Sequence, residues 1–483
     1  MEVLIVVIFV LGYLAITLEH SLKVDKLVPA LLMMALAWAA VAFGLEGFDQ
    51  WFDSGNHHLL NGETLENGQK IVDFSKLPLH VEGNAHATYS ASKAGWLEHT
   101  LLHHFGKTCE ILIFLVGAMT IVEIIDHFDG FSTIKNYVRT NKKKTLLWIM
   151  CVLAFILSAI IDNLTATIVL ITILRKLIPE NKDRIWFAGL IIIAANAGGA
   201  WSPIGDVTTT MLWMGEKVSA LKLVEYLILP SLICMLIPTI LASFLKPFQG
   251  HFESPPAAGN ENAKGPLMLY LGLSLIVFVP IFKTVTHLPP YIGMMLSLSI
   301  VALVAELITA RQFSMTNLGD EIDHVDEGGH NSPTFKALAK IEMPSILFFL
   351  GILMTVAALE SLGLIFTFGQ DVNAAMDTNI FVMLLGAGSA VIDNVPLVAA
   401  SMGMFDMSAT NASGELLYAA DSHVWHFIAY AAGTGGSMLI IGSAAGVVAM
   451  GMEKISFFWY LKNMAWLALI GYVAGAGVFL LMS

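Results

Sequence analysis

Long apolar segments alternate with shorter polar ones along most of this chain. Several of the apolar segments approach the roughly 20 residues that a helix needs to cross the hydrocarbon core of a bilayer. They are residues 3–18, 27–45, 111–125, 146–161, 223–245, 267–282 and 464–482. Only the acidic Glu2 precedes the first segment as a charged residue, and no small-residue cleavage pattern follows it, so we expect a retained helix and not a signal peptide. The pattern predicts an all-α polytopic membrane protein.

The composition agrees with this class and argues against others. Of 483 residues, 56% are apolar and only 13% are charged, which does not suit a soluble enzyme. The net charge of −13 argues against a nucleic-acid partner, and acidic residues are frequent in the polar segments 47–108 and 311–341, which we expect to be solvated. The few cysteines, Cys109, Cys151 and Cys234, suit neither a disulfide framework nor a Cys-based metal motif. No buried hydrolase motif occurs, so we expect neither an enzyme nor a cofactor.

A repeated order of residues divides the chain into two halves. Segment 198–219 can be laid without gaps on segment 435–456. The residues that then match are Gly198, Gly199, Ile204, Gly205, Glu216, Lys217 and Ser219, opposite Gly435, Gly436, Ile441, Gly442, Glu453, Lys454 and Ser456. Matching residues that occur in the same order indicate a duplicated unit of about 110–246 and 343–482. We therefore predict that the two halves of the chain are 1–246 and 247–483.

The distribution of Lys and Arg predicts how the halves are oriented. Loops 127–145 and 175–184 are both rich in basic residues, and the positive-inside rule places both in the cytoplasm. Segment 146–178 lies between them, so we expect it to enter the membrane and return as a re-entrant hairpin. The second hairpin, 378–404, has flanks without Lys or Arg and should open to the opposite side.

The predicted architecture is therefore a pair of inverted-topology repeats. Each repeat has five spanning helices, one of them broken, and one re-entrant hairpin, because inversion requires an odd number of crossings. The broken helices are expected at about 185–214 and 423–450, and both chain ends outside. The alternative is a row of ten or more ordinary helices in which the matches are accidental.

The hairpin tips carry the residues that first suggest a function. Asp162, Asn163 and Thr165 lie at the first tip, and Asp393 and Asn394 at the second. A carboxylate at bilayer depth costs about 2.5–3.5 kcal/mol, so such residues mark a pathway or a binding site by default. Carboxylate, amide and hydroxyl oxygens are suited to Na⁺ or Li⁺, and a carboxylate can hold a proton instead. We predict a Na⁺ site at Asp162, Asn163, Asp393 and Asn394.

The broken helices are predicted from their glycines. The helix-breaking residues are Gly198, Gly199, Pro203 and Gly205 in the first half and Gly435, Gly436 and Gly442 in the second. Unwound backbone at membrane depth offers carbonyl oxygens to a small cation, whereas the alternative role of such glycines is close helix packing. Polar residues of these segments join the candidate ion- and proton-binding set: Asn196, Asp206, Thr208, Thr209, Thr434 and Ser437. Asp206 is a third embedded acid, which the second half replaces with Ser443.

Segment 47–108 is expected to be an outer loop rich in histidine. Its histidines are His57, His58, His80, His86, His99, His103 and His104. Solvated histidines, a metal site at His99 and His103, and pH sensing are the three alternatives. The acids Glu123, Asp126, Glu306 and Glu360 lie near predicted helix ends, where an interfacial role is favoured.

These motifs resemble the NhaD-type Na⁺/H⁺ antiporters of the ion transporter superfamily. The resemblance rests on residues 114–125, 160–167, 196–209 and 392–399 and covers most of the chain. It implies exchange of cytoplasmic Na⁺ or Li⁺ for external H⁺, a homodimer, and a transport domain that moves against a scaffold. The corresponding location is the inner (plasma) membrane of a bacterium.

Other activities remain as alternatives at this point. Superfamily relatives that carry dicarboxylates have Ser-Asn-Thr at the hairpin tips, whereas this chain has Asp-Asn at both, and an aspartate would repel an anionic substrate. Efflux or sodium-coupled transport of a small anion, of the arsenite or dicarboxylate type, is the main alternative. A passive channel would need a continuous pore, and an intramembrane hydrolase would need a motif that the chain lacks.

Overall fold

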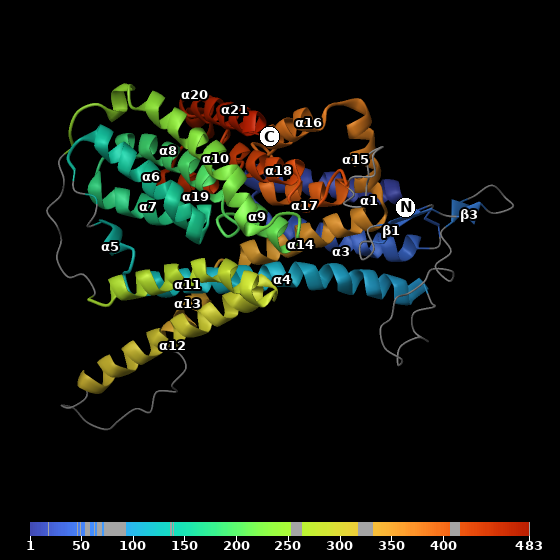
Figure 1. Cartoon of the computed structure of the whole chain (residues 1–483), viewed down its shortest axis with the longest axis horizontal. Coiled ribbons are helices and arrows are strands. Elements are labelled where there is room, and N and C mark those ends of the chain that lie inside the picture. Colours follow the sequence, from blue (N-terminus) through green and yellow to red (C-terminus); the bar gives the residue numbers. More distant parts are fainter. Residues whose placement is uncertain are drawn as a thin grey trace. The chain divides into compact units, whose positions relative to one another are not determined.

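The computed structural model shows a chain that is mostly helical, as predicted (Figure 1). It describes residues 1–17, 19–45, 47–48, 50–53, 58–61, 63–64, 70–71, 93–135, 138, 140–252, 263–316, 332–405 and 416–482. Short strands form two antiparallel pairs: β1 (Gln50–Asp53) with β2 (His58–Asn61), and β3 (Glu63–Thr64) with β4 (Lys70–Ile71).

Within the described residues, 8 helices are long and apolar enough to cross a membrane. They are α3 (Leu27–Gly44), α4 (Lys93–His127), α6 (Lys143–Ile161), α10 (Ala220–Ala242), α11 (Gly265–Thr286), α12 (Pro290–Thr316), α14 (Met343–Ser361) and α21 (Ala465–Met482). This set confirms a multi-pass integral membrane protein.

Shorter helices connect or interrupt the long ones. They are α1 (Glu2–Thr17), α2 (Glu19–Leu22), α5 (Ser132–Lys135), α7 (Asn163–Leu177), α8 (Asn181–Gly199), α9 (Val207–Met214), α13 (Pro333–Lys340), α15 (Leu364–Ala375), α16 (Thr378–Gly388), α17 (Asn394–Met404), α18 (His423–Gly435), α19 (Ala444–Glu453) and α20 (Phe457–Asn463). A 3₁₀ turn at Lys246–Phe248 follows α10. The order helix, break, helix therefore occurs at α6–α7, α8–α9, α16–α17 and α18–α19.

The expected outer loop ends earlier than predicted, because α4 begins at Lys93. His99, His103 and His104 are therefore helical rather than in a loop, and the buried His104 ring lies 3.3 Å from the Ser361 hydroxyl. The polar residues of the first turns of α4 dilute its hydropathy, so an apolar window detects only its second half. Among the other histidines of this segment, His58 lies in β2, and the rest fall outside the described residues.

The chain divides into two compact units. Unit 1 comprises residues 1–112, 343–381 and 395–424, and unit 2 comprises residues 113–342, 382–394 and 425–483. In unit 1, α3 packs on α14, where the Trp38 indole N–H donates to the Met354 carbonyl at 2.7 Å and Gly351 lies against the Ala30 backbone.

Unit 2 contains the extensive packing of α10 on α21 and of α6 on α8. Glycines of α21 permit the first of these contacts, since a Cβ on Gly475 would meet the Pro230 carbonyl oxygen and one on Gly471 the Cys234 carbonyl oxygen. Figure 1 shows α6, α7 and α8 side by side, and α19 also contacts α7 and α8. Residues in or directly before α7, α8, α9, α17 and α19 form the candidate site.

Candidate ion-binding site

The first hairpin tip is a break of one residue between α6 and α7. Asp162 occupies it with φ +84° and ψ 158°, a backbone conformation that is costly for a residue with a side chain. Its carboxylate caps α7, because Oδ1 accepts from the Thr165 backbone N–H and Oδ2 from the Thr165 hydroxyl, both at 2.8 Å. Asp162 is half-buried, and the positive end of the α7 dipole stabilises its negative charge.

The first broken helix unwinds between α8 and α9. Gly198 and Gly199 are the last residues of α8, whereas Pro203 and Gly205 lie within the break. The broken helix touches α6 directly, since a Cβ on Gly198 would meet the Phe155 carbonyl oxygen and a Cβ on Gly205 would meet the Ser158 carbonyl oxygen. These two glycines thus allow the unwound segment to lie against the hairpin.

Asp206 ends this break and caps α9. Its Oδ1 accepts from both the backbone N–H and the hydroxyl of Thr208, each at 2.9 Å. The Thr209 hydroxyl instead donates to the Asp206 carbonyl oxygen, also at 2.9 Å. Only 3% of Asp206 is exposed, so its carboxylate depends on these and other protein donors for solvation.

Asparagines from both hairpin tips donate to the same carboxylate. The Asn163 Nδ2 atom lies 2.7 Å from Asp206 Oδ2, and the Asn394 Nδ2 atom lies 3.3 Å from the same oxygen. Asn163 also donates to Asn196 Oδ1 at 3.0 Å, and Asn196 Nδ2 donates to the Ser443 hydroxyl at 3.0 Å. We call these five residues (Asn163, Asn196, Asp206, Asn394 and Ser443) the Asp206 cluster, and all of them are buried.

The second half of the chain has residues at the equivalent positions of its hairpin tip and its broken helix, but one of them differs in chemistry. Asp393, half-buried, precedes Asn394 at the start of α17, and its carboxyl group lies within electrostatic range of Asp206. Ser443 ends the second break and caps α19, where its hydroxyl accepts from the Gly446 N–H at 3.2 Å. Thr434 and Ser437 are buried, but their hydroxyls donate to the carbonyl oxygens of Tyr430 and Thr434 rather than to the Asp206 cluster.

Equivalent contacts hold each broken helix against its hairpin. The Ser158 hydroxyl donates to the Ala195 carbonyl at 2.6 Å, and the Ser389 hydroxyl donates to the Ala432 carbonyl at 3.0 Å. The glycines repeat as well, because Gly435 lies against the Gly386 carbonyl oxygen as Gly198 lies against Phe155. Likewise Gly442 lies against the Ser389 carbonyl oxygen, where the first half has Gly205 against Ser158.

Sequence reasoning had not included Ser158, Ser389 or Ser443 among the candidate site residues. A signal for the first two was present, since a serine stands four residues before the aspartate of each tip. Ser443 was recognised only as the residue that replaces Asp206, and its contact with Asn196 joins the two broken helices directly.

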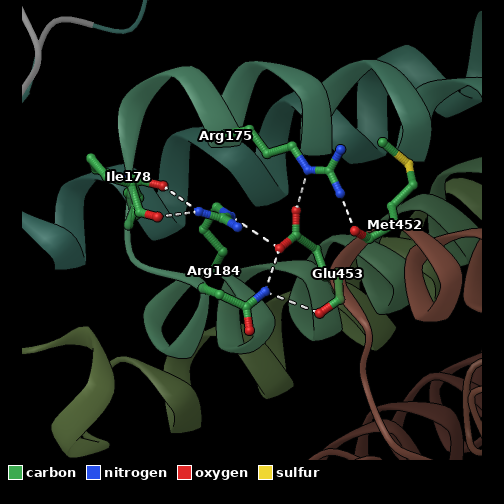
Figure 2. A network of polar contacts seen from close by, with 7 residues as sticks. Arg175, Ile178, Arg184, Met452 and Glu453 are labelled. Carbon is green, nitrogen blue, oxygen red and sulfur yellow. Dashed lines mark hydrogen bonds and ion pairs between the residues drawn. The ribbon is translucent and has the colours of Figure 1, made fainter.

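A second buried polar group lies at the far ends of the same helices (Figure 2). The Glu453 carboxylate, fully buried, accepts from Arg175 Nε at 2.6 Å, from Arg184 Nε at 3.0 Å and from Asn181 Nδ2 at 2.9 Å. Arg175 also donates to the Met452 carbonyl oxygen, which is at the end of α19. We call Glu453, Arg175, Arg184 and Asn181 the Glu453 cluster. It ties the connection between α7 and α8 to the end of α19.

Comparisons with known proteins agree with this architecture. The profile of the citrate transporter family (CitMHS) matches residues 3–421. The chain is 42% identical over 388 residues to "Sodium/proton antiporter 1" of Arabidopsis thaliana, a match that covers 79% of the chain and 63% of the plant protein. It is 30% identical over 494 residues to the "Na(+)/H(+) antiporter NhaD" of Vibrio cholerae, which covers 99% of the chain and 91% of the relative.

A solved structure shares the fold. The YdaH transporter of Alcanivorax borkumensis has a TM-score of 0.57 and 11% sequence identity, with 93% of this chain and 97% of that one covered. The chain spans less than two thirds of the length of the first plant relative. The relatives come from plants as well as from bacteria. The family profile and the match to NhaD over nearly the whole chain show that this protein belongs to the citrate transporter (CitMHS) family and, within it, to the NhaD-type antiporters.

Proposed function

We propose that this protein exchanges Na⁺ or Li⁺ for H⁺, with the ions competing for the membrane-embedded carboxylates at and around the Asp206 cluster. The observation that carries the proposal is the convergence of Asn163 and Asn394, one from each hairpin tip, on the buried carboxylate of Asp206. Because this carboxylate accepts hydrogen bonds from both tips, a change in its charge affects both of them. Protonation or cation binding at this group therefore alters contacts in both halves at once.

The asparagines suit an exchange of ligands. A side-chain amide presents either its NH₂ group or its carbonyl oxygen to a neighbour after a half-turn about its last torsion. Without a cation, Asn163 and Asn394 donate to Asp206. With Na⁺ beside the carboxylate, the same amides would turn their oxygens toward the cation, and Asp162 and Asp393 would supply further negative charge. A proton on Asp206 removes that charge, so proton and cation binding exclude each other.

We further propose that the two halves, 1–246 and 247–483, are inverted repeats. The duplicated serine and glycine contacts of the two broken helices support the duplication. The basic loops on either side of the first hairpin support the inversion.

Thiol labelling in intact cells tests the inversion. Cysteines introduced at the exposed positions Asn141 and Lys182 should be protected from an impermeant external maleimide, whereas one at the exposed Ala374 should react. Reaction at Lys182 together with protection at Asn141 would make the first hairpin a spanning segment and end the inverted arrangement.

Everted membrane vesicles with a pH-sensitive dye test the exchange itself. Addition of Na⁺ or Li⁺ should dissipate an imposed proton gradient in wild-type vesicles, and Asp162→Asn, Asp206→Asn and Asp393→Asn should each abolish the response while the protein remains inserted. A variant that keeps near-normal exchange removes its aspartate from the site. Chemical cross-linking in the same membranes tests the homodimer that the resemblance implies.

Transport of an anion is the second candidate, because the family profile is described as that of a citrate transporter. The Asp206 cluster argues against it, since its charged member is an acid and the nearby Asp162 and Asp393 are acids too. Uptake of radiolabelled citrate that depends on Na⁺, with no Na⁺-driven proton movement, would favour this candidate.

A further inference from the structure

A cavity of about 240 Å³ lies beside α7 in unit 2. One wall comes from the end of α4 and the residues after it, and the other comes from one face of α7. The polar residues of the two walls are Glu123, Asp126, Asp129, Ser132, Thr165, Thr172 and Lys176. Since one water occupies about 30 Å³ in the liquid, the cavity has room for a small cation with several waters.

The cavity reaches the first hairpin tip. Thr165 lines it, and the hydroxyl and backbone N–H of the same residue donate to the Asp162 carboxylate. Thr172 and Lys176 follow Thr165 along α7 at helical spacing, so this wall extends about 16 Å from the tip toward the end of the helix. That end carries Arg175 and Lys176, which the positive-inside rule places in the cytoplasm.

The opposite wall carries three carboxylates, and Glu123 lies within electrostatic range of Lys340 without forming an ion pair with it. Glu123 is half-buried, whereas Asp126 and Asp129 are exposed at the outer part of the wall. In the part of the chain that the structure describes, Glu123 forms neither an ion pair nor a hydrogen bond through its side chain. A half-buried carboxylate that faces a polar cavity attracts a mobile cation more strongly than one in bulk water.

The second half of the chain also places a glutamate of a long helix against the second helix of a hairpin, within unit 1. The alignment of Asp162 with Asp393 pairs Thr172 of α7 with Gly403 of α17. A Cβ on Gly403 would lie 3.3 Å from Cγ of Glu360, which is near the end of α14. A glutamate near the end of the long helix before each hairpin therefore faces the second helix of that hairpin.

We propose that the cavity is the cytoplasmic access path of the hydrated cation to Asp162, and that Glu123 is the residue that concentrates cations in it. This inference rests on the proposed Na⁺/H⁺ exchange. Glu123 does not belong to the Asp206 cluster, so it acts on the arrival of the ion rather than on its final binding. Its loss should weaken the apparent affinity for Na⁺ and leave the maximal rate in place.

The test compares Glu123→Gln with wild type in everted vesicles, where the cytoplasmic face is accessible. A cleft lined by acidic residues raises the local cation concentration by about 10- to 1000-fold. Glu123 supplies only part of that effect, because Asp126 and Asp129 line the same cavity. We therefore expect the apparent KM for Na⁺ to rise about 2- to 10-fold in Glu123→Gln. The maximal rate should stay within about twofold, and added choline chloride should narrow the difference in KM through screening. Glu225→Gln, at an exposed pair with Lys222, is the matched control and should leave KM unchanged.

A second variant tests the path itself. Thr172→Cys, in a background with the native cysteines replaced by serine, should lose exchange when a bulky cationic thiol reagent is added from the cytoplasmic side, and Na⁺ should slow that reaction. An unchanged KM in Glu123→Gln overturns the role of Glu123, and loss of its maximal rate at saturating Na⁺ overturns it as well. Full exchange after complete modification of Thr172→Cys overturns the path. Absence of Na⁺-driven proton movement in wild type would instead refute the proposed function.

Discussion

Replacement of Glu453 by alanine should destabilise the protein by about 3 kcal/mol. Removal of one partner from a buried ion pair costs about 3–5 kcal/mol, because the remaining charge stays buried without compensation. The two arginines differ in this respect. Arg184 is 13% exposed and would keep only the carbonyl oxygens of Ile178 and Pro179 as acceptors, whereas Arg175 is 43% exposed and can turn toward solvent. The expected loss therefore lies at the low end of that range.

Unfolding by sodium dodecyl sulfate in mixed micelles measures this free energy. Glu225→Ala is the control, because its pair with Lys222 is exposed and should contribute less than about 1 kcal/mol. Replacement of both Glu453 and Arg184 by leucine should recover part of the loss, since no buried charge then remains between those two. A loss below about 1 kcal/mol in Glu453→Ala would show that the carboxylate is solvated in the native state and would refute the reasoning.

Further predictions concern the Asp206 cluster and its supporting backbone. Gly205→Ala should lower stability and abolish exchange, because the new Cβ would meet the Ser158 carbonyl oxygen, whereas Gly477→Ala, which has open space around it, should be neutral in both thermal unfolding and transport assays. Ser443→Ala removes the acceptor of Asn196 and should cost about 1–3 kcal/mol. The same variant should raise the apparent KM for Na⁺ in dye-quenching assays, and an unchanged KM would show that Asn196 needs no partner there.

Several of the long apolar helices could be predicted from the sequence to within a few residues. The predicted segments 27–45 and 464–482 correspond to α3 and α21. Membrane helices are easily predicted because their apolar length is set by the bilayer itself. The start of α4 at Lys93 was missed because its first turns carry charged and histidine residues, for which hydropathy gives no helical signal.

The membership of the site stays a prediction, whereas the structure shows how several of its residues contact one another. The sequence places the predicted Na⁺ site at Asp162, Asn163, Asp393 and Asn394, and Asp206 enters only as a third embedded acid that the second half replaces with Ser443. The structure places Asp206 at the centre, where Asn163 and Asn394 meet it from 43 and 188 residues away in the sequence. Side-chain convergence over such separations depends on how the hairpins pack against the breaks, which no local pattern encodes.

The residues that cap α9 and α19 differ in chemistry: Asp206 caps α9 with an ionisable carboxyl group, whereas Ser443 caps α19 with a hydroxyl group that does not ionise. In the proposed exchange, Asp206 binds either a proton or a cation, so its contact with Asn163 would change with its occupant. Ser443 has no accessible ionisation, and its hydrogen bond with Asn196 has the same strength at every physiological pH. In the proposed exchange, the contact between Ser443 and Asn196 would stay constant, while the contact between Asn163 and Asp206 would change. A chain with aspartate at both caps would lack such a constant contact, because both ends of the network would shift together.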